Sequence, residues 1–147
     1  MTAVRKPQLT EVHTSPEGGS MSGKVVHFEI PFDDGERAHT FYRDTFGWQL
    51  DPVPGMGYTI AMTGPNDPER GPTEPGFING GMFERSAEFP AKAPTIVIDV
   101  PSVDEALRKV EAAGGKTATE KMPVGDMGFA GYFTDTEGNL IGLWESA

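Results

Sequence analysis

Apolar and polar residues alternate through residues 24–31, where the chain reads KVVHFEIP. This period of two, carried by β-branched and aromatic residues, predicts a strand. The period then changes to that of a helix, with apolar or small residues at i, i+3, i+4 and i+7: Ala38, Phe41, Tyr42 and Thr45. An acidic N-cap at Asp33 or Asp34 and a closing Gly47 place this helix before residue 47.

Three further strands are expected in the first half of the chain, at residues 48–52, 58–63 and 77–83. Between the last two lies the segment GPNDPERGPTEPG, residues 64–76. Its four prolines and its glycines are typical of a loop rich in turns.

The same order of elements then repeats. A strand is predicted at residues 95–100, a helix follows the capping box formed by Ser102 and Glu105, and Gly114 ends it. Three more strands are expected, at residues 116–122, 128–134 and 140–145. Two such halves predict an α+β fold of paired βαβββ modules, about 24–83 and about 94–146, forming a curved mixed sheet around a pocket.

Alternation also sorts the strand side chains by face. In the first strand Val26, Phe28 and Ile30 form one row, which we expect beneath the helices. His27 and Glu29 form the other row and should face the inner side of the sheet. The same logic turns three residues of the second half inward: Thr95, Asp99 and Trp144. A few polar groups among apolar ones indicate a ligand pocket on that side.

Residues 1–22 contain few large apolar side chains, so we expect a flexible N-terminal tail before a domain at 23–147. Translation could start at Met1 or at Met21, and the sequence leaves both open. The tail has no apolar core of the secretory type, and no stretch approaches a membrane span. A cytoplasmic location is therefore the expectation.

The chain is acidic, with 22 Asp and Glu against 12 Lys and Arg, a formal charge of −10. This charge argues against nucleic acid and anionic membranes as partners, since both attract Lys and Arg clusters. It suits solubility, and it also suits a neutral or cationic small-molecule ligand. The absence of cysteine excludes disulfides and thiolate chemistry.

Three segments carry a resemblance to a known family: VVHFEIPFDDGERAHTFYRDTFGWQL, FINGGMF and FTDTEGNLIGLWE. Together they resemble the vicinal oxygen chelate superfamily, which has the fold of glyoxalases, bleomycin-resistance proteins and extradiol dioxygenases. The closest similarity is to glyoxalase-like proteins of unassigned activity. The resemblance covers residues 24–146 and implies a pocket in the curved sheet and a homodimer that completes or buries it.

Enzymes of this superfamily hold one divalent metal with four inward ligands. The resemblance places the four ligand positions at His27, Thr95, Gly81 and Gly142. Asn79 is an alternative to Gly81. Of His27, Thr95 and the two glycines, only His27 offers a good donor, and a catalytic metal needs about three protein ligands. We therefore expect no cofactor. A divalent metal stays possible through a rebuilt set of His27, Glu29 and Asp99.

Three functions follow as hypotheses. The first is a metal-free protein that binds a small molecule in a pocket containing His27, Glu29, Asn79, Thr95, Asp99 and Trp144. The alternative is a lyase, isomerase or dioxygenase that uses a rebuilt metal site, or His27 and Glu29 as catalytic acid and base. The third is a dimeric domain with a vestigial pocket and a role in assembly.

Overall fold

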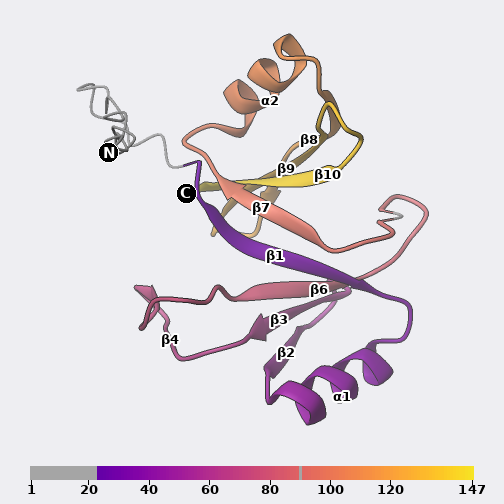
Figure 1. The fold of residues 1–147 in the computed structure, drawn as a ribbon, viewed down its shortest axis with the longest axis vertical. Helices are drawn as coiled ribbons and strands as arrows, with labels where there is room; N and C mark the ends of the chain where they lie inside the picture. The colour runs from indigo at the N-terminus through magenta and orange to yellow at the C-terminus, as the bar shows by residue number, and fades with distance from the viewer. Residues whose placement is uncertain (1–22, 90) are drawn as a thin grey trace, which may run out of the picture.

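The computed structural model describes residues 23–89 and 91–147 (Figure 1). The predicted tail and both candidate start sites lie outside these residues. The first half of the chain forms β1 (Val25–Phe32), α1 (Gly35–Phe46), β2 (Gln49–Val53), β3 (Tyr58–Met62) and β6 (Gly80–Glu84). The second half forms β7 (Thr95–Asp99), α2 (Val103–Ala112), β8 (Lys116–Val124), β9 (Gly128–Thr134) and β10 (Leu140–Ser146). The predicted α+β class with two βαβββ modules is confirmed.

One continuous sheet of eight strands joins the two modules, in the order β2-β3-β6-β1-β7-β10-β9-β8. The first strands of the modules, β1 and β7, pair antiparallel at the centre, with Phe28 opposite Ile96. Each then pairs parallel with the last strand of its own module, β6 or β10. The order is therefore symmetric about the β1–β7 pair, and the helices lie at opposite ends of the molecule in Figure 1. A short hairpin of β4 (Asn66–Asp67) and β5 (Gly71–Pro72) lies in the predicted loop.

The predicted helix ends are present. The side chain of Asp34 accepts a hydrogen bond from the Arg37 N–H, and Gly47 closes α1 in a left-handed conformation with φ of 72°. Ser102 caps α2 by accepting from the Glu105 N–H. Each cap satisfies an N–H that has no partner within its helix. Neither of these two helices, the only ones in the described ranges, has the length and apolar character needed to cross a lipid bilayer.

Both helices cover the same face of the sheet. On the α1 side the Phe28 ring lies 5.7 Å from Trp48, which stacks on Tyr42 at 4.7 Å. On the α2 side a core of Val103, Leu107 and Leu143 packs with several partly buried residues: Ile98, Val100, Ala106, Phe129 and Phe133. Because Phe28 and Ile96 are register partners, their side chains share this face, the outer face. The opposite, inner face receives His27 and Glu29, as the alternation predicts.

Candidate functional site

Glu29 lies at the centre of the inner face. In the sheet its neighbour on β6 is Gly81 and its neighbour on β7 is Thr95. Its side chain is only 6% exposed, and Thr95 beside it is buried. A carboxyl group in such a place needs hydrogen-bond donors, because removal from water penalises its charge.

Two tyrosine hydroxyls supply those donors. The Tyr132 hydroxyl, from β9, donates a short hydrogen bond to Glu29 Oε1, and the Tyr58 hydroxyl, from β3, also bonds to this carboxylate. The Tyr58 oxygen lies 2.7 Å from His27 Nε2. We call His27, Glu29, Tyr58 and Tyr132 the inner-face cluster. The Tyr58 hydroxyl therefore lies between His27 Nε2 and the Glu29 carboxyl group, and the tautomer of His27 sets whether the hydroxyl donates to the imidazole or accepts from it.

Burial sets the protonation of this cluster. It lowers the pKa of His27 to about 4, so the imidazole is neutral near pH 7. Burial raises the pKa of Glu29, and the hydrogen bonds from Tyr132 and Tyr58 oppose part of that rise. Burial and the nearby Glu29 charge raise the pKa of both tyrosines above their usual range, which keeps them protonated donors.

The glycines at the two carboxylate positions implied by the resemblance leave room for these tyrosines. A Cβ atom on Gly81 would overlap the Tyr58 hydroxyl. One on Gly142 would approach the Tyr132 ring to 3.1 Å and the Val97 side chain to 3.0 Å. The tyrosine side chains therefore fill the space into which metal-binding carboxylates would project.

The residues present do not fit a divalent metal. Within the described ranges, no group of three or more His, Cys, Asp or Glu side chains is placed to hold an ion. The rebuilt set of His27, Glu29 and Asp99 is not assembled: Glu29 is bonded to two tyrosines, and Asp99 lies at the far end of β7, where its N–H bonds to the Lys24 carbonyl. The alternative of a metal held by these three residues is therefore not supported by their arrangement in the described part of the chain.

The other predicted pocket residues separate into two groups. Asp99 and Trp144 are register partners on β7 and β10, so they lie side by side on the inner face. Asn79 has a different role, since its amide oxygen accepts from the Thr63 N–H at 2.8 Å and its amide nitrogen donates to Asn66 at 3.2 Å. It holds the loop after β3 and makes no described hydrogen bond to the inner-face cluster.

Apolar side chains line the outer parts of the inner face. Ile60 on β3 is the register partner of Gly81 and is 36% exposed. Met122 on β8 is the partner of Ala130 and is 38% exposed. These two residues stand on opposite modules. Together they give the inner face apolar flanks around a polar centre, the composition of a small-molecule site.

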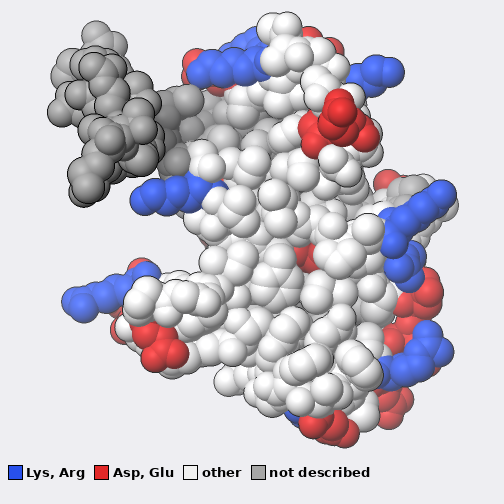
Figure 2. Space-filling view, viewed as in Figure 1, with Lys and Arg blue, Asp and Glu red and all other residues white. Residues whose placement is uncertain are grey.

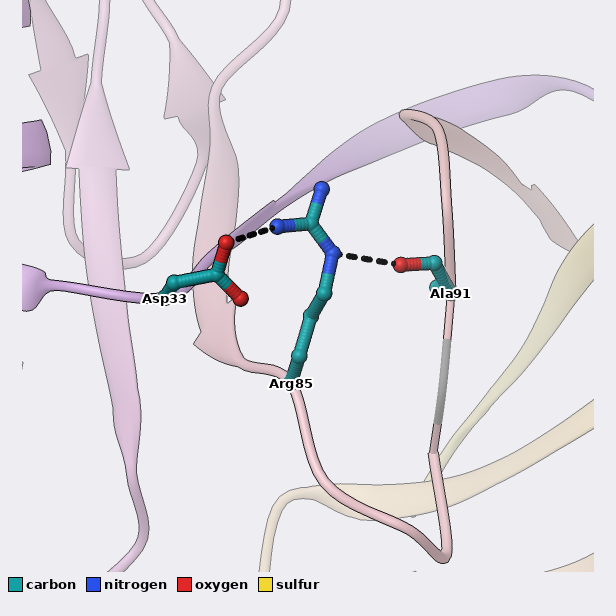
Figure 3. A network of polar contacts seen from close by, with 3 residues as sticks. All are labelled: Asp33, Arg85 and Ala91. Atoms are coloured by element: carbon teal, nitrogen blue, oxygen red, sulfur yellow. Dashed lines mark hydrogen bonds and ion pairs between the residues drawn. The ribbon is translucent and has the colours of Figure 1, made fainter.

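The segment between the two modules also reaches the cluster. The Phe89 ring packs edge-on against Tyr132 at 4.7 Å and against Phe83 at 4.9 Å. Figure 3 shows how Arg85 fixes this segment, with one hydrogen bond to the Ala91 carbonyl and an ion pair to Asp33 at the start of α1. Phe89 therefore shields one side of the Tyr132–Glu29 bond from water.

Sequence reasoning missed Tyr58, Tyr132, Ile60 and Met122. Alternation within each strand carried a signal, because Tyr132 lies opposite in phase to the outer-face Phe129 and Phe133. No local pattern indicated that Tyr132 bonds to Glu29, since the two residues are 103 positions apart in the sequence. The large aromatic side chains of the strands and loops separate between the two faces. Trp48, Phe129 and Phe133 belong to the outer-face packing, Phe77 packs over Gly64, and Trp144 is on the inner face.

A continuous sheet of two βαβββ modules, with the candidate site on the face away from the helices, is the fold of the vicinal oxygen chelate superfamily. The family model for the bleomycin resistance protein-like N-terminal domain matches residues 24–64. A glyoxylase-like domain-containing protein of Didymella fabae is 32% identical over 122 residues, which cover 81% of this chain and 91% of the relative. The chain belongs to this glyoxalase-like family.

Solved structures agree on the fold. A hypothetical protein from Bacillus halodurans C-125 has a TM-score of 0.57 at 19% identity, covering 84% of this chain and 94% of that one. Methylmalonyl-CoA epimerase of Streptomyces coelicolor, in complex with 2-nitronate-propionyl-CoA, has a TM-score of 0.59 at 20% identity, covering 87% and 99%. At such identities the similarity concerns the fold alone.

Proposed function

We propose that this protein binds a small molecule on the inner face of its sheet without a catalytic metal, as a member of the bleomycin-resistance-like branch of its family. The observation that carries the proposal is the pair of glycines, Gly81 and Gly142, at the implied carboxylate positions, with tyrosines filling the space above them. The one carboxylate at the centre, Glu29, is engaged by these tyrosines. The inner face can therefore offer hydrogen bonds and apolar surface to a ligand.

The chemistry of the face supports a flat, cationic ligand. His27 is neutral and does not repel a cation, and its Nδ1 is free to accept a hydrogen bond when Nε2 donates to Tyr58. Asp99 and Trp144 place a carboxylate beside an indole ring, a combination that attracts organic cations. The formal charge of −10 adds long-range attraction.

A metal assay and a ligand-binding assay test the proposal together. Protein purified without an affinity tag should contain far less than one equivalent of metal by elemental analysis. N-methylquinolinium should raise the melting temperature more than neutral quinoline or the non-aromatic tetramethylammonium. At 100 times its dissociation constant, a ligand adds about 2.7 kcal/mol to the free energy of unfolding.

The variant Asp99→Asn should lose the preference for the aromatic cation. Asp126→Asn, which removes an equal charge from an exposed turn, is the matched control and should keep it. About one equivalent of metal per chain, lost in His27→Ala, would contradict the proposal. Equal effects of the three compounds on the wild type would contradict the choice of ligand class.

A second function, metal-independent acid–base catalysis, has one observation in its favour. The hydrogen-bonded chain from His27 through Tyr58 to Glu29 links a neutral imidazole to a carboxyl group of raised pKa. Such a chain can accept a proton from a bound ligand and return it, as a lyase or isomerase requires. Solvent deuterium incorporation into a bound ligand, abolished in Glu29→Gln, would distinguish this activity from simple binding.

A further inference from the structure

The exposed side of α1 carries an unusual amount of aromatic surface. None of the residues of α1 is fully buried, whereas α2 buries Val103 and Leu107. Phe41 is 56% exposed and Phe46 is 61% exposed. Their rings form one continuous cluster with Tyr42 and Trp48, at centroid distances of 4.7–6.4 Å. We call these four residues the α1 aromatic patch, and surfaces of this kind mark interaction sites.

Charges of opposite sign flank the patch in a self-complementary order. Arg37, Phe41 and Asp44 are spaced at i, i+4 and i+7, so they lie along one side of α1. Within one chain Asp44 forms an exposed ion pair with Arg43, at 3.5 Å, which a second copy would compete with. When two copies of α1 pack antiparallel about a two-fold axis near Phe41, Arg37 of each copy faces the partner's Asp44. The same surface then serves both copies, as a two-fold symmetric interface requires.

A hollow beside the patch can receive the partner's aromatic ring. It has a volume of about 360 Å³, and its lining combines the apolar side chains of Phe32, Ala38 and Phe41 with charged residues, Asp33, Asp34 and Arg37. Arg85 forms one wall, and its ion pair with Asp33 holds it there (Figure 3). In Figure 2 the uncharged surface in the middle of the view lies over the central strands, whereas acidic and basic side chains border the region of α1 at the bottom.

The edges of the sheet are poor alternatives for self-association. The two edge strands, β2 and β8, carry Pro52 and Pro123, which have no N–H to donate to an added strand. Extension of the sheet by a second copy is therefore disfavoured.

We propose that a second copy of this chain docks on the α1 aromatic patch, with α1 antiparallel to its partner helix and the Arg37–Asp44 pairs on either side of Phe41. Because the eight-stranded sheet is completed within one chain, each inner face stays whole in its own subunit. This arrangement differs from a dimer that completes the pocket, which the resemblance led us to expect.

Sedimentation equilibrium of the full chain tests the proposal. The wild type should form a dimer, and Phe41→Asp should be monomeric. Arg37→Asp and Asp44→Arg should each raise the dimer dissociation constant about tenfold, which corresponds to about 1.4 kcal/mol. The double variant Arg37→Asp/Asp44→Arg restores opposite charges across the two-fold axis and should recover most of the wild-type affinity.

Met56→Asp is the matched control, since Met56 is 59% exposed and lies outside the patch. It should stay dimeric, and circular dichroism should show that every variant is folded. A monomeric wild type, a dimeric Phe41→Asp, or a double variant as weak as the single ones would each overturn the proposal. A retained response to N-methylquinolinium in monomeric Phe41→Asp would support the separation of the inner face from the interface, and its loss would contradict it.

Discussion

Glu29 illustrates how a single side chain determines the chemistry of this site. It lies between Gly81 and Thr95, two of the positions at which the family resemblance implies metal ligands. Its carboxylate is held by Tyr132 and Tyr58, and each tyrosine uses space left by a glycine. A side chain at position 81 and the Tyr58 hydroxyl therefore exclude each other, since a Cβ atom on Gly81 would overlap that hydroxyl.

Replacement of Tyr132 by Phe should destabilise the protein by about 1–3 kcal/mol, because a buried carboxylate loses a hydrogen-bond donor. Urea denaturation at pH 7 measures the effect. Tyr42→Phe is the control, since no hydrogen bond is described for the hydroxyl of Tyr42 in the covered residues, and it should change stability by less than about 0.5 kcal/mol. Equal effects of the two substitutions would show that the Tyr132–Glu29 bond contributes little.

His27 should make stability depend on pH between about 4 and 6.5. Its pKa is about 4 in the folded protein and 6.5 in the unfolded chain, so the unfolded chain binds more protons in this interval. Stability from this group is therefore complete above pH 6.5 and is lost as the pH falls to 4, by up to about 3 kcal/mol.

The comparison of wild type with His27→Gln isolates this effect, because the raised pKa of Glu29 acts in both proteins and in the opposite direction. Stability from Glu29 is present below pH 4.5 and declines as the pH rises through its folded pKa. Urea denaturation from pH 4 to 7 should show a steeper rise for the wild type than for His27→Gln. Parallel curves would mean that His27 titrates normally.

At the scale of elements, the glutamate of the GLWE segment has a structural role. Glu145 on β10 accepts a hydrogen bond from the Val103 N–H at the start of α2, at 2.9 Å, and pairs with Lys121 on β8 at 3.3 Å. The carboxylate thus joins three elements and stabilises the positive end of the helix. It faces the outer side and does not belong to the inner-face cluster.

Glu145→Ala should therefore cost about 1–2 kcal/mol in the free energy of unfolding, since α2 loses a capping acceptor. Glu145→Gln should cost less, because its amide oxygen can still accept from the Val103 N–H. Thermal denaturation followed by circular dichroism gives both values. Glu137→Ala, in the exposed turn before β10, controls for loss of charge, and a cost equal to that of Glu145→Ala would refute the capping role.

At the scale of the whole molecule, the charge of −10 opposes the compact state. An increase in potassium chloride from about 0.01 to 0.15 M shortens the Debye length from about 30 to 8 Å and weakens this repulsion. The melting temperature should rise over this interval. A fall would indicate that attractive ion pairs, such as Arg85–Asp33, outweigh the net repulsion.

The sequence by itself determined the two modules. Alternation, capping residues and closing glycines are local signals, and they placed both helices and the central strands close to their observed positions because each depends on neighbours in the chain. The sidedness of β1 followed for the same reason, as Phe28 against the helices and His27 on the inner face show.

Only the tertiary structure decided which side chains meet across the inner face. Tyr58 is 31 residues from His27, and Tyr132 is 103 residues from Glu29, so these contacts depend on strand order and register. The same is true of Asp99, which shares a face with His27 and lies two residues beyond Val97, the register partner of His27, yet forms no metal-holding group with it among the described residues. Local patterns fix the face on which a residue lies, and the folded sheet fixes its position on that face.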